Sequence, residues 1–366
     1  MECKRCLLTT SISDVKLDDN GVCNFCHHHD KIEASCKGFS FDRFAARLRA
    51  SRTGRYDCLI PISGGLDSSI LLHKMVKDYH LRPLVIHMDN HWNTPEANHN
   101  IEVLTRALNL DYIRYHLDET EFNSINKSFL KASVSDADIP NDMAMVEFFR
   151  LACKHYKIKW VINGHDYKRE GTTPLSWTYM DSKYIESVHM RHSGRRIKSF
   201  PLMSLKRQFL YAFRGIKHIS PLYYIDFDTE VEKERLIRLY DWRWYGAKHA
   251  ENKYTWFVGG YLLPVKFGID KRILYLSAQV RSGIRLKEEA KMILNEPIPE
   301  PKKIIAEVKK RHGWSTAEWN AMMKQPTRTH HEYDTYHPFF KKYRWIMWIM
   351  WRLNAVSRNF YMKYCK

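Results

Sequence analysis

The segment that most constrains this chain is a short loop between an apolar run and a helical pattern. Residues 56–62 form the apolar run, and residues 68–79 carry apolar side chains at helical spacing. The loop between them reads Ser63-Gly64-Gly65-Leu66-Asp67-Ser68-Ser69. Glycines after a strand let the backbone approach an anion closely, and the following helix presents unpaired N–H groups and the positive end of its dipole. The pattern predicts a phosphate-binding loop.

The polar side chains of this loop suit two roles. The hydroxyls of Ser63, Ser68 and Ser69 can donate hydrogen bonds to phosphate oxygens. Asp67 would repel a phosphate, so an acid here is best explained as a ligand of Mg²⁺, which bridges carboxylates and phosphates. A plain glycine-rich turn capped by serine is the structural alternative. The chain has neither a Walker-type loop nor the GxGxxG fingerprint of dinucleotide-binding folds.

Helical and strand-like stretches alternate around this loop. We expect helices at 41–52, 68–79, 95–109 and 143–157, and strands at 56–62, 83–88, 112–116 and 160–163. Strands separated by helices predict an α/β fold with a parallel sheet and right-handed crossovers. Ligands of such sheets bind beyond the carboxyl ends of the strands. After residue 220 the pattern becomes mainly helical and rich in aromatic residues, with a further helix at 302–312.

Two CxxC pairs near the N-terminus predict a metal site. Cys3 and Cys6 are followed after sixteen residues by Cys23 and Cys26, which fits the spacing of paired CxxC zinc sites. Four thiolates fill a tetrahedral Zn²⁺, so we expect a structural ion that supplies the folding free energy of this small segment. A redox CxxC is the alternative. The run His27-His28-His29 offers competing ligands that we do not expect to be used.

Composition limits the class of protein without choosing its substrate. The chain has 366 residues and a formal net charge of +18, which suits nucleic acid, an anionic membrane surface or acidic small molecules as partners. The N-terminus lacks the apolar core of a signal peptide, and no uncharged apolar run is long enough to cross a bilayer. We therefore expect a cytoplasmic protein in a reducing compartment, without a disulfide framework.

The loop string resembles the signature of the PP-loop ATP pyrophosphatases. Members of that superfamily cleave ATP between the α and β phosphates, adenylate a substrate oxygen and release pyrophosphate, after which a nitrogen or sulfur nucleophile displaces AMP. The resemblance implies a PP-loop domain of the adenine nucleotide alpha hydrolase-like fold that uses ATP and Mg²⁺. It implies roles for Ser63, Gly64, Gly65, Asp67, Ser68 and Ser69 at the pyrophosphate and Mg²⁺, for His87 and Asp89 at the adenosine, and for Gly164 in the same cleft.

Further strings resemble the N-acetyl sugar amidotransferases of this superfamily, which act in bacterial surface polysaccharide and flagellar sugar biosynthesis. They are residues 87–93, 240–249 and 257–272, with the N-terminal Cys-x-x-Cys-Leu, and the resemblance covers roughly residues 1–295. Such enzymes convert the acetamido group of an N-acetyl sugar acid or nucleotide sugar into an acetamidino group, with ammonia from glutaminase and ammonia-channel partner subunits. The resemblance implies a catalytic Lys248, with His249, Lys266, Lys271 and Arg272 near phosphate or substrate.

We expect four regions along the chain. They are a zinc-ribbon-like module with four cysteines at 1–36, a PP-loop ATP-binding α/β domain at 40–220, a mainly helical substrate or partner domain at 221–325, and a basic aromatic tail at 330–366. In the tail, Trp345, Trp348 and Trp351 recur at i, i+3 and i+6 between basic residues. We favour a terminal helix packed on the core or on a partner subunit. The alternative is an amphipathic helix in peripheral contact with the inner face of the membrane. Val280-Arg281 departs from the family pattern, where an apolar or small residue is expected.

Two other functions stay open. A tRNA thiolase of the same superfamily would suit the CxxC pairs, the loop and the positive charge, but such enzymes usually need a sulfur-carrying cysteine near the ATP cleft. Cys58 and Cys153 lie outside any CxxC pair. A zinc-ribbon nucleic-acid-binding module with an inactive loop is disfavoured by the intact Gly64, Gly65 and Asp67. We therefore expect no nucleic-acid partner.

Overall fold

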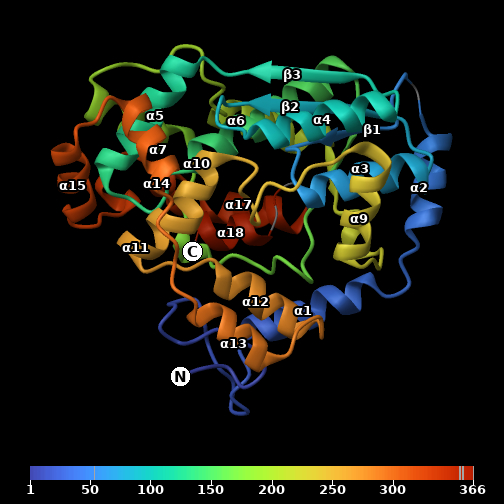
Figure 1. Cartoon of the computed structure of the whole chain (residues 1–366), viewed down its shortest axis with the longest axis horizontal. Coiled ribbons are helices and arrows are strands. Elements are labelled where there is room, and N and C mark those ends of the chain that lie inside the picture. The colour runs from blue at the N-terminus through green and yellow to red at the C-terminus, as the bar shows by residue number, and fades with distance from the viewer. Residues whose placement is uncertain (53, 354–355, 357, 366) are drawn as a thin grey trace.

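A five-stranded parallel sheet forms the upper part of the molecule in Figure 1. The computed structural model describes residues 1–52, 54–353, 356 and 358–365. The strand order is β3-β2-β1-β4-β5, and every neighbouring pair is parallel. The strands are β1 (Cys58–Pro61), β2 (Pro83–Asp89), β3 (Tyr112–His116), β4 (Trp160–Ile162) and β5 (Lys217–Ile219).

The predicted α/β fold with a parallel sheet is confirmed. All four predicted strands form, although β1 is confined to Cys58–Pro61. The fifth strand, β5, was not predicted, because Lys217 and His218 are exposed and give it no apolar pattern. It exists because its backbone pairs with the edge of β4, with Val161 opposite His218.

Alternate residues of the strands enter two separate cores, as the two-residue period of a strand requires. Ile60 of β1 packs on one face with α2 (Phe41–Ala50), α3 (Leu66–Lys77), α4 (Pro95–Ala107) and α9 (Thr229–Tyr240). Leu59 packs on the other face with α5 (Glu119–Ala132), α6 (Ile139–His155) and α7 (Ser182–Ser193). Helices therefore cover both faces of the sheet, which leaves the carboxyl ends of the strands for a ligand.

Most of the second half of the chain is helical and enlarges the second core. Phe340, Met347, Met350 and Tyr364 are buried there, so the tail packs against the protein along one side. Within the described residues, no helix has the length and apolarity needed to cross a membrane. The remaining elements that are not introduced below are α8 (Leu205–Arg214), α10 (Lys253–Trp256), the π-helical turn η3 (Phe257–Leu262), α11 (Leu263–Phe267), α14 (Lys302–His312), α15 (Thr316–Lys324), α16 (His337–Lys342), α17 (Arg344–Arg352), α18 (Arg358–Tyr364), and the short 3-10 turns η1 (Leu175–Trp177), η2 (Pro221–Tyr223) and η4 (His330–Glu332).

The N-terminal cysteine segment is held against a helical pair from the distant part of the chain (Figure 1). It ends in α1 (Asn24–Cys36), and the pair consists of α12 (Arg272–Arg281) and α13 (Lys287–Asn295). The backbone N–H of Leu7 donates to Ser277 Oγ at 3.2 Å, and Lys287 Nζ donates to the carbonyl of Cys3 at 2.8 Å. The segment is thus held in place by hydrogen bonds to Ser277 and Lys287 in addition to the packing of its own cysteines.

The loop between β1 and α3 is pressed against α4. Gly64 has a φ of +79°, and a Cβ built on it would lie 2.2 Å from the carbonyl oxygen of Ala97. Asn100 of α4 donates from Nδ2 to the carbonyl of Gly64 at 3.0 Å. Only glycine fits this position, because a side chain would meet backbone atoms and the backbone would be strained. The helix α3 then begins at Leu66, two residues earlier than predicted, which puts Asp67 in its first turn.

We predict that Gly64→Ala lowers the free energy of unfolding by more than about 2 kcal/mol, because it combines positive-φ strain with a backbone clash. Chemical denaturation measures this. Gly164→Ala is the matched control, since its Cβ would meet its nearest atoms only at 3.5 Å. Equal effects of the two substitutions would contradict the close approach of the loop to α4.

Candidate functional site

Two loops meet where the strand order of the sheet reverses. The chain goes from β1 to β2 and β3 on one side, and then crosses to β4 and β5 on the other. Open parallel sheets bind ligands at such a switch point. The Ser63–Ser69 loop follows β1, and Gly164 follows β4. A Cβ on Gly164 would lie 3.5 Å from the backbone of Asp67, so the two loops are in close contact.

The three serines of the loop have different surroundings. Ser63 Oγ lies 3.2 Å from Ser68 Oγ and accepts a hydrogen bond from the backbone N–H of Gly65 at 3.2 Å. Both Ser63 and Ser68 are half-buried and can reach a ligand. Ser69 is fully buried, donates to the carbonyl of Gly65 at 2.8 Å and accepts from the indole of Trp242 at 3.0 Å. Ser69 therefore holds the backbone of the loop in position and does not face the space where a ligand would bind.

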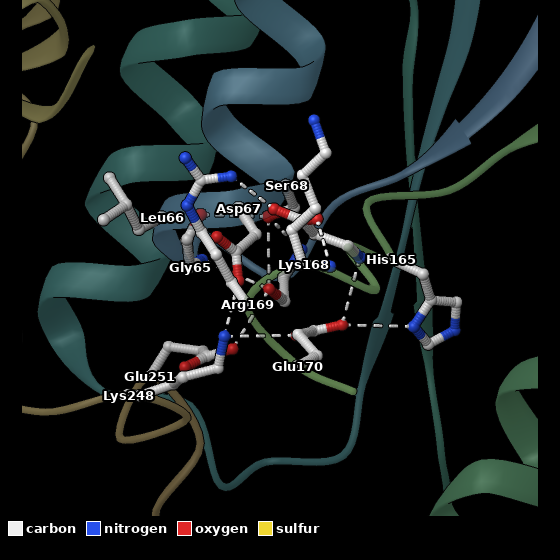
Figure 2. Close-up of polar contacts among 12 residues, drawn as sticks. Gly65, Leu66, Asp67, Ser68, His165, Lys168, Arg169, Glu170, Lys248 and Glu251 are labelled. Carbon is white, nitrogen blue, oxygen red and sulfur yellow. Dashed lines mark hydrogen bonds and ion pairs between the residues drawn. The ribbon is translucent and has the colours of Figure 1, made fainter. Parts of the chain in front are cut away.

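Lys248 is the central cation of the site. Its Nζ lies 3.1 Å from Asp67 Oδ2 and 3.3 Å from Glu170 Oε1 (Figure 2). Burial alone would lower the pKa of Lys248, but the two carboxylates hold it above its ordinary value, so the ammonium stays charged. Three segments far apart in the sequence are thus joined by one ammonium group.

Glu170 continues this chain of contacts to His165. Its Oε2 lies 3.3 Å from His165 Nδ1, and the hydrogen bond raises the pKa of that imidazole (Figure 2). Burial would raise the pKa of Glu170, but His165 and Lys248 lower it, so it stays ionised. Glu170 was not identified from the sequence, because no motif in the segment after Gly164 indicates a role for it. Its position shortly after the turn that follows β4 is the signal that was available.

Glu251 is the second acid that the sequence did not reveal. Its Oε1 accepts from Ser63 Oγ at 3.3 Å, and its Oε2 is buried without a hydrogen-bond partner among the described residues. A Cβ on Gly65 would lie 2.6 Å from Oε1, so the carboxyl group points into the loop. Burial, with a smaller contribution from the charge of Asp67, raises the pKa of Glu251 to about 7.

The residues from Tyr245 to Glu251 form a strap across the loop. The hydroxyl of Tyr245 accepts a hydrogen bond from the N–H of Leu66 at 2.8 Å. It thereby satisfies one of the backbone N–H groups that have no partner within the first turn of α3. His249 has a φ of 63° and lies with its ring 5.6 Å from that of Tyr275. Burial and then the charge of Lys248 lower the pKa of His249 to about 4, which keeps its imidazole neutral at pH 7.

This donor set suits a chain of phosphates with a divalent cation. The start of α3 and the Ser63 and Ser68 hydroxyls offer hydrogen bonds to phosphate oxygens. Asp67 and the unpartnered oxygen of Glu251 offer ligands to a hard cation. Lys248 supplies a positive charge that can pair with the carboxylate of Asp67 and with phosphate oxygens.

The residues predicted at the adenosine lie at the ends of the neighbouring strands. His87 is buried, with Nδ1 2.8 Å from the carbonyl of Ile62 and Nε2 3.0 Å from Asn93. Asp89 is buried and pairs with Arg114 at 2.8 Å and with His116 at 3.0 Å. Both side chains are committed to protein partners. A polar cavity of about 310 Å³ opens at this end of the sheet, lined by Asp89, His91, Asn93, Asn98, Arg114, Glu119 and Arg311.

Two of the predicted substrate residues make their contacts elsewhere. Lys266 donates to the carbonyl of Met322. Arg272 pairs with Asp270 at 2.8 Å and donates to backbone carbonyls at the end of α13. The charge of Lys271 makes a small contribution, after burial and the charge of Lys248, to the lowered pKa of His249.

The four predicted metal ligands converge in the N-terminal segment. The sulfurs of Cys3, Cys6, Cys23 and Cys26 are fully buried and lie within 4.8 Å of one another, with three of the separations between 3.6 and 3.8 Å. Thiolates at about 2.3 Å from one tetrahedral ion would lie about 3.8 Å apart. The cluster therefore has the geometry of a closed metal site.

Arg281 explains one departure from the family pattern. It is buried and directs Nη1 toward Cys6 Sγ at 3.7 Å. Four thiolates around a divalent ion would carry an excess of negative charge, which this guanidinium would offset. The neighbouring histidines bond elsewhere, since His27 pairs with Asp18 at 2.8 Å and His29 lies 3.4 Å from Ser282 Oγ.

The structure is that of an α/β protein with a parallel sheet whose first strand ends in a serine–glycine loop at the switch point. Residues 251–347 match a family model described as LPS biosynthesis protein WbpG-like, C-terminal domain. This segment therefore resembles a WbpG-like C-terminal domain, which agrees with the resemblance to sugar-modifying enzymes of surface polysaccharide biosynthesis that the sequence suggested.

Two further similarities extend over most of the chain. An uncharacterized protein of Methanocaldococcus jannaschii is 26% identical over 263 residues, which cover 70% of this chain and 79% of that protein. The solved U34-tRNA thiolase NcsA from Methanococcus maripaludis, with its 4Fe-4S cluster, is 12% identical. That alignment covers 86% of this chain and 99% of the thiolase at a TM-score of 0.29.

We predict one tightly bound metal ion per chain, measured by elemental analysis, and its loss in Cys6→Ser. Metal binding supplies the folding free energy of such small sites, about 10–16 kcal/mol in isolated peptides. Chelation should therefore expose residues 1–36 to protease before the rest of the chain. Cys36→Ser is the matched control, because Cys36 lies outside the cluster and should keep the metal. Retention of metal by Cys6→Ser would refute the site.

We predict that Glu251→Gln raises the melting temperature at pH 8 more than at pH 5. The pKa of Glu251 is raised from 4.5 to about 7, so the folded protein favours the neutral carboxyl group. The free energy of unfolding therefore falls as the pH rises from 4.5 to about 7, and glutamine, which stays neutral, avoids this loss. Glu307→Gln is the control with the opposite sign. Lys253 and Arg311 lower the pKa of Glu307, so this variant should lose most stability at neutral pH and less below pH 4.5. A pH-independent effect of Glu251→Gln would contradict its buried position in the loop.

Proposed function

We propose that this protein is an ATP-dependent amidotransferase that acts on an N-acetyl sugar, either a sugar acid or a nucleotide sugar. In this proposal the acetamido group becomes an acetamidino group, with release of AMP and pyrophosphate, during bacterial surface glycan biosynthesis. The proposal combines the PP-loop chemistry of ATP with the lipopolysaccharide-biosynthesis domain at residues 251–347.

The observation that carries the proposal is the strap from Tyr245 to Glu251. It contacts the loop through the Tyr245 hydroxyl, the Lys248 ammonium and the Glu251 carboxyl group. Glu251 is also the first residue of the WbpG-like domain. The domain related to glycan biosynthesis therefore begins inside the candidate nucleotide site, so the loop and the sugar-related domain support one activity.

The reaction needs activation of a poor leaving group. The amide oxygen attacks the α-phosphorus, the bond to the bridging oxygen of the β-phosphate breaks, and pyrophosphate leaves. Ammonia then adds to the imidate carbon and loses a proton, and the carbon–oxygen bond to AMP breaks. The protein contributes positioning and charge compensation. Lys248 is placed to offset charge on the phosphates, and the first turn of α3 to hold the leaving pyrophosphate.

Two metal ions belong to this proposal. Bound Mg²⁺, held by Asp67 with Glu251 in reach of the same space, would neutralise phosphate charge. Zn²⁺ on the four cysteines would have a structural role, because four protein ligands leave no open position. Ammonia is expected from glutaminase and ammonia-channel partner subunits.

Cys58 and Cys153, the two cysteines weighed for a thiolase, are poorly suited to carry sulfur. Cys58 and Cys153 are buried, and burial raises the pKa of both thiols. Within the described residues, no cysteine hydrogen-bonds to Asp67, Glu170 or Lys248. A thiol that carries sulfur must be accessible and readily ionised, so these surroundings favour amidotransfer.

The test is incubation with ATP, Mg²⁺, ammonium chloride and candidate N-acetyl sugar acids or nucleotide sugars. We expect AMP, pyrophosphate and an amidine product one mass unit lighter than the amide. With ¹⁸O in the acetamido carbonyl, the label should appear in AMP, because the amide oxygen leaves with the α-phosphate. Formation of ADP, or unlabelled AMP, would rule out this mechanism.

We predict that Asp67→Asn and Lys248→Ala each reduce pyrophosphate release by about 100-fold or more, since the first removes a ligand of the proposed Mg²⁺ and the second removes a positive charge at the reacting phosphates. Lys248→Arg should recover part of the loss, because it keeps the charge. Asp226→Asn is the control, as Asp226 is a highly exposed acid that pairs with Lys168 outside the loop. Normal turnover in Asp67→Asn would overturn the assigned site.

A further inference from the structure

The helix α17 presents an unusual outward face. Trp345, Trp348, Ile349, Arg352 and Leu353 lie at i, i+3, i+4, i+7 and i+8, which places them along one side. Trp345 is 62% exposed, Trp348 47% and Leu353 73%. The opposite side is buried through Met347 and Met350. The helix is therefore packed on the core by its methionines, while its large aromatic side chains face solvent.

Exposed tryptophans in such an arrangement need a physical explanation. Contiguous apolar side chains are costly in water and mark surfaces that bind something. Packing within the protein does not require this face, because Trp351 already stacks on Tyr361 at 5.3 Å and holds α17 to α18. Substrate chemistry does not require it either, since the contacts of the candidate site involve none of these residues.

The charges around this face narrow the choice of partner. Residues 335–366 contain seven Lys and Arg and no Asp or Glu. Lys341, Lys342, Arg344 and Arg352 are exposed beside the tryptophans. A second copy bound through the same face would bring these cations against their own counterparts, which is unfavourable. The partner must therefore combine negative charge with an apolar layer.

We propose that this face of α17 binds the surface of an anionic phospholipid bilayer. Tryptophan rings settle at the boundary between head groups and acyl chains, where the ring is apolar and the indole N–H stays hydrated. Lysine and arginine beside them pair with anionic head groups. The inference is independent of the proposed reaction and makes the protein peripheral to a membrane, bound by an interfacial helix.

The test is sedimentation of the full-length protein with vesicles at low ionic strength. Vesicles of phosphatidylcholine with phosphatidylglycerol should carry the protein down, and those of phosphatidylcholine alone should not. Binding should fall in 0.5 M salt. The double variant Trp345→Ser, Trp348→Ser should bind at least about tenfold more weakly, and Lys342→Gln about fivefold more weakly.

Leu286→Ser is the matched control, because Leu286 is 70% exposed and lies beside α13. It should bind vesicles as the unmodified protein does, and all variants should keep its melting temperature. Binding to both vesicle types alike, or unchanged binding of the tryptophan variant, would overturn the proposal. A dimer in analytical ultracentrifugation that the tryptophan variant dissociates would assign the face to self-association instead.

Discussion

Three carboxyl groups converge on the end of the sheet where a polyanion is proposed to bind, and one ammonium group makes this possible. Asp67 and Glu170 ion-pair with Lys248, and Glu251 at the end of the strap accepts a hydrogen bond from Ser63 of the loop. Acids gathered in partly dehydrated surroundings repel one another strongly unless a cation lies among them. The fold must therefore bring α3, the segment after β4 and the strap at 245–251 together at the Lys248 ammonium nitrogen.

The sequence predicted the parts of this arrangement that depend on local patterns. The loop after β1, the first four strands and the four clustered cysteines follow from short-range spacing. It did not predict Glu170 or Glu251, whose roles depend on which distant segments the fold brings together. Arg272 was expected near substrate but caps the end of α13, while the charge of its neighbour Lys271 contributes to the lowered pKa of His249. Proximity between distant segments is a tertiary property, and no periodicity within either segment encodes it.

In the N-terminal module, the structure gives a physical reason for a residue that departs from the family pattern. Arg281 stands where a small or apolar residue was expected, and it directs its guanidinium to the sulfur of Cys6. The same helix, α12, also provides Ser277, which binds the backbone of Leu7. The module therefore depends both on its own thiolates and on α12, so its stability is coupled to the distant part of the chain.

The strap has a consequence for how such proteins can diversify. If all side chains that contact the nucleotide loop came from the first half of the chain, exchange of gene segments could join that half to many acceptor domains. Here Tyr245, Lys248 and Glu251 reach back to that loop from the far side of the chain. A foreign acceptor domain would have to bring its own equivalents of these three side chains. New acceptor preferences are therefore expected to arise through gradual change downstream of the strap rather than through exchange of whole segments.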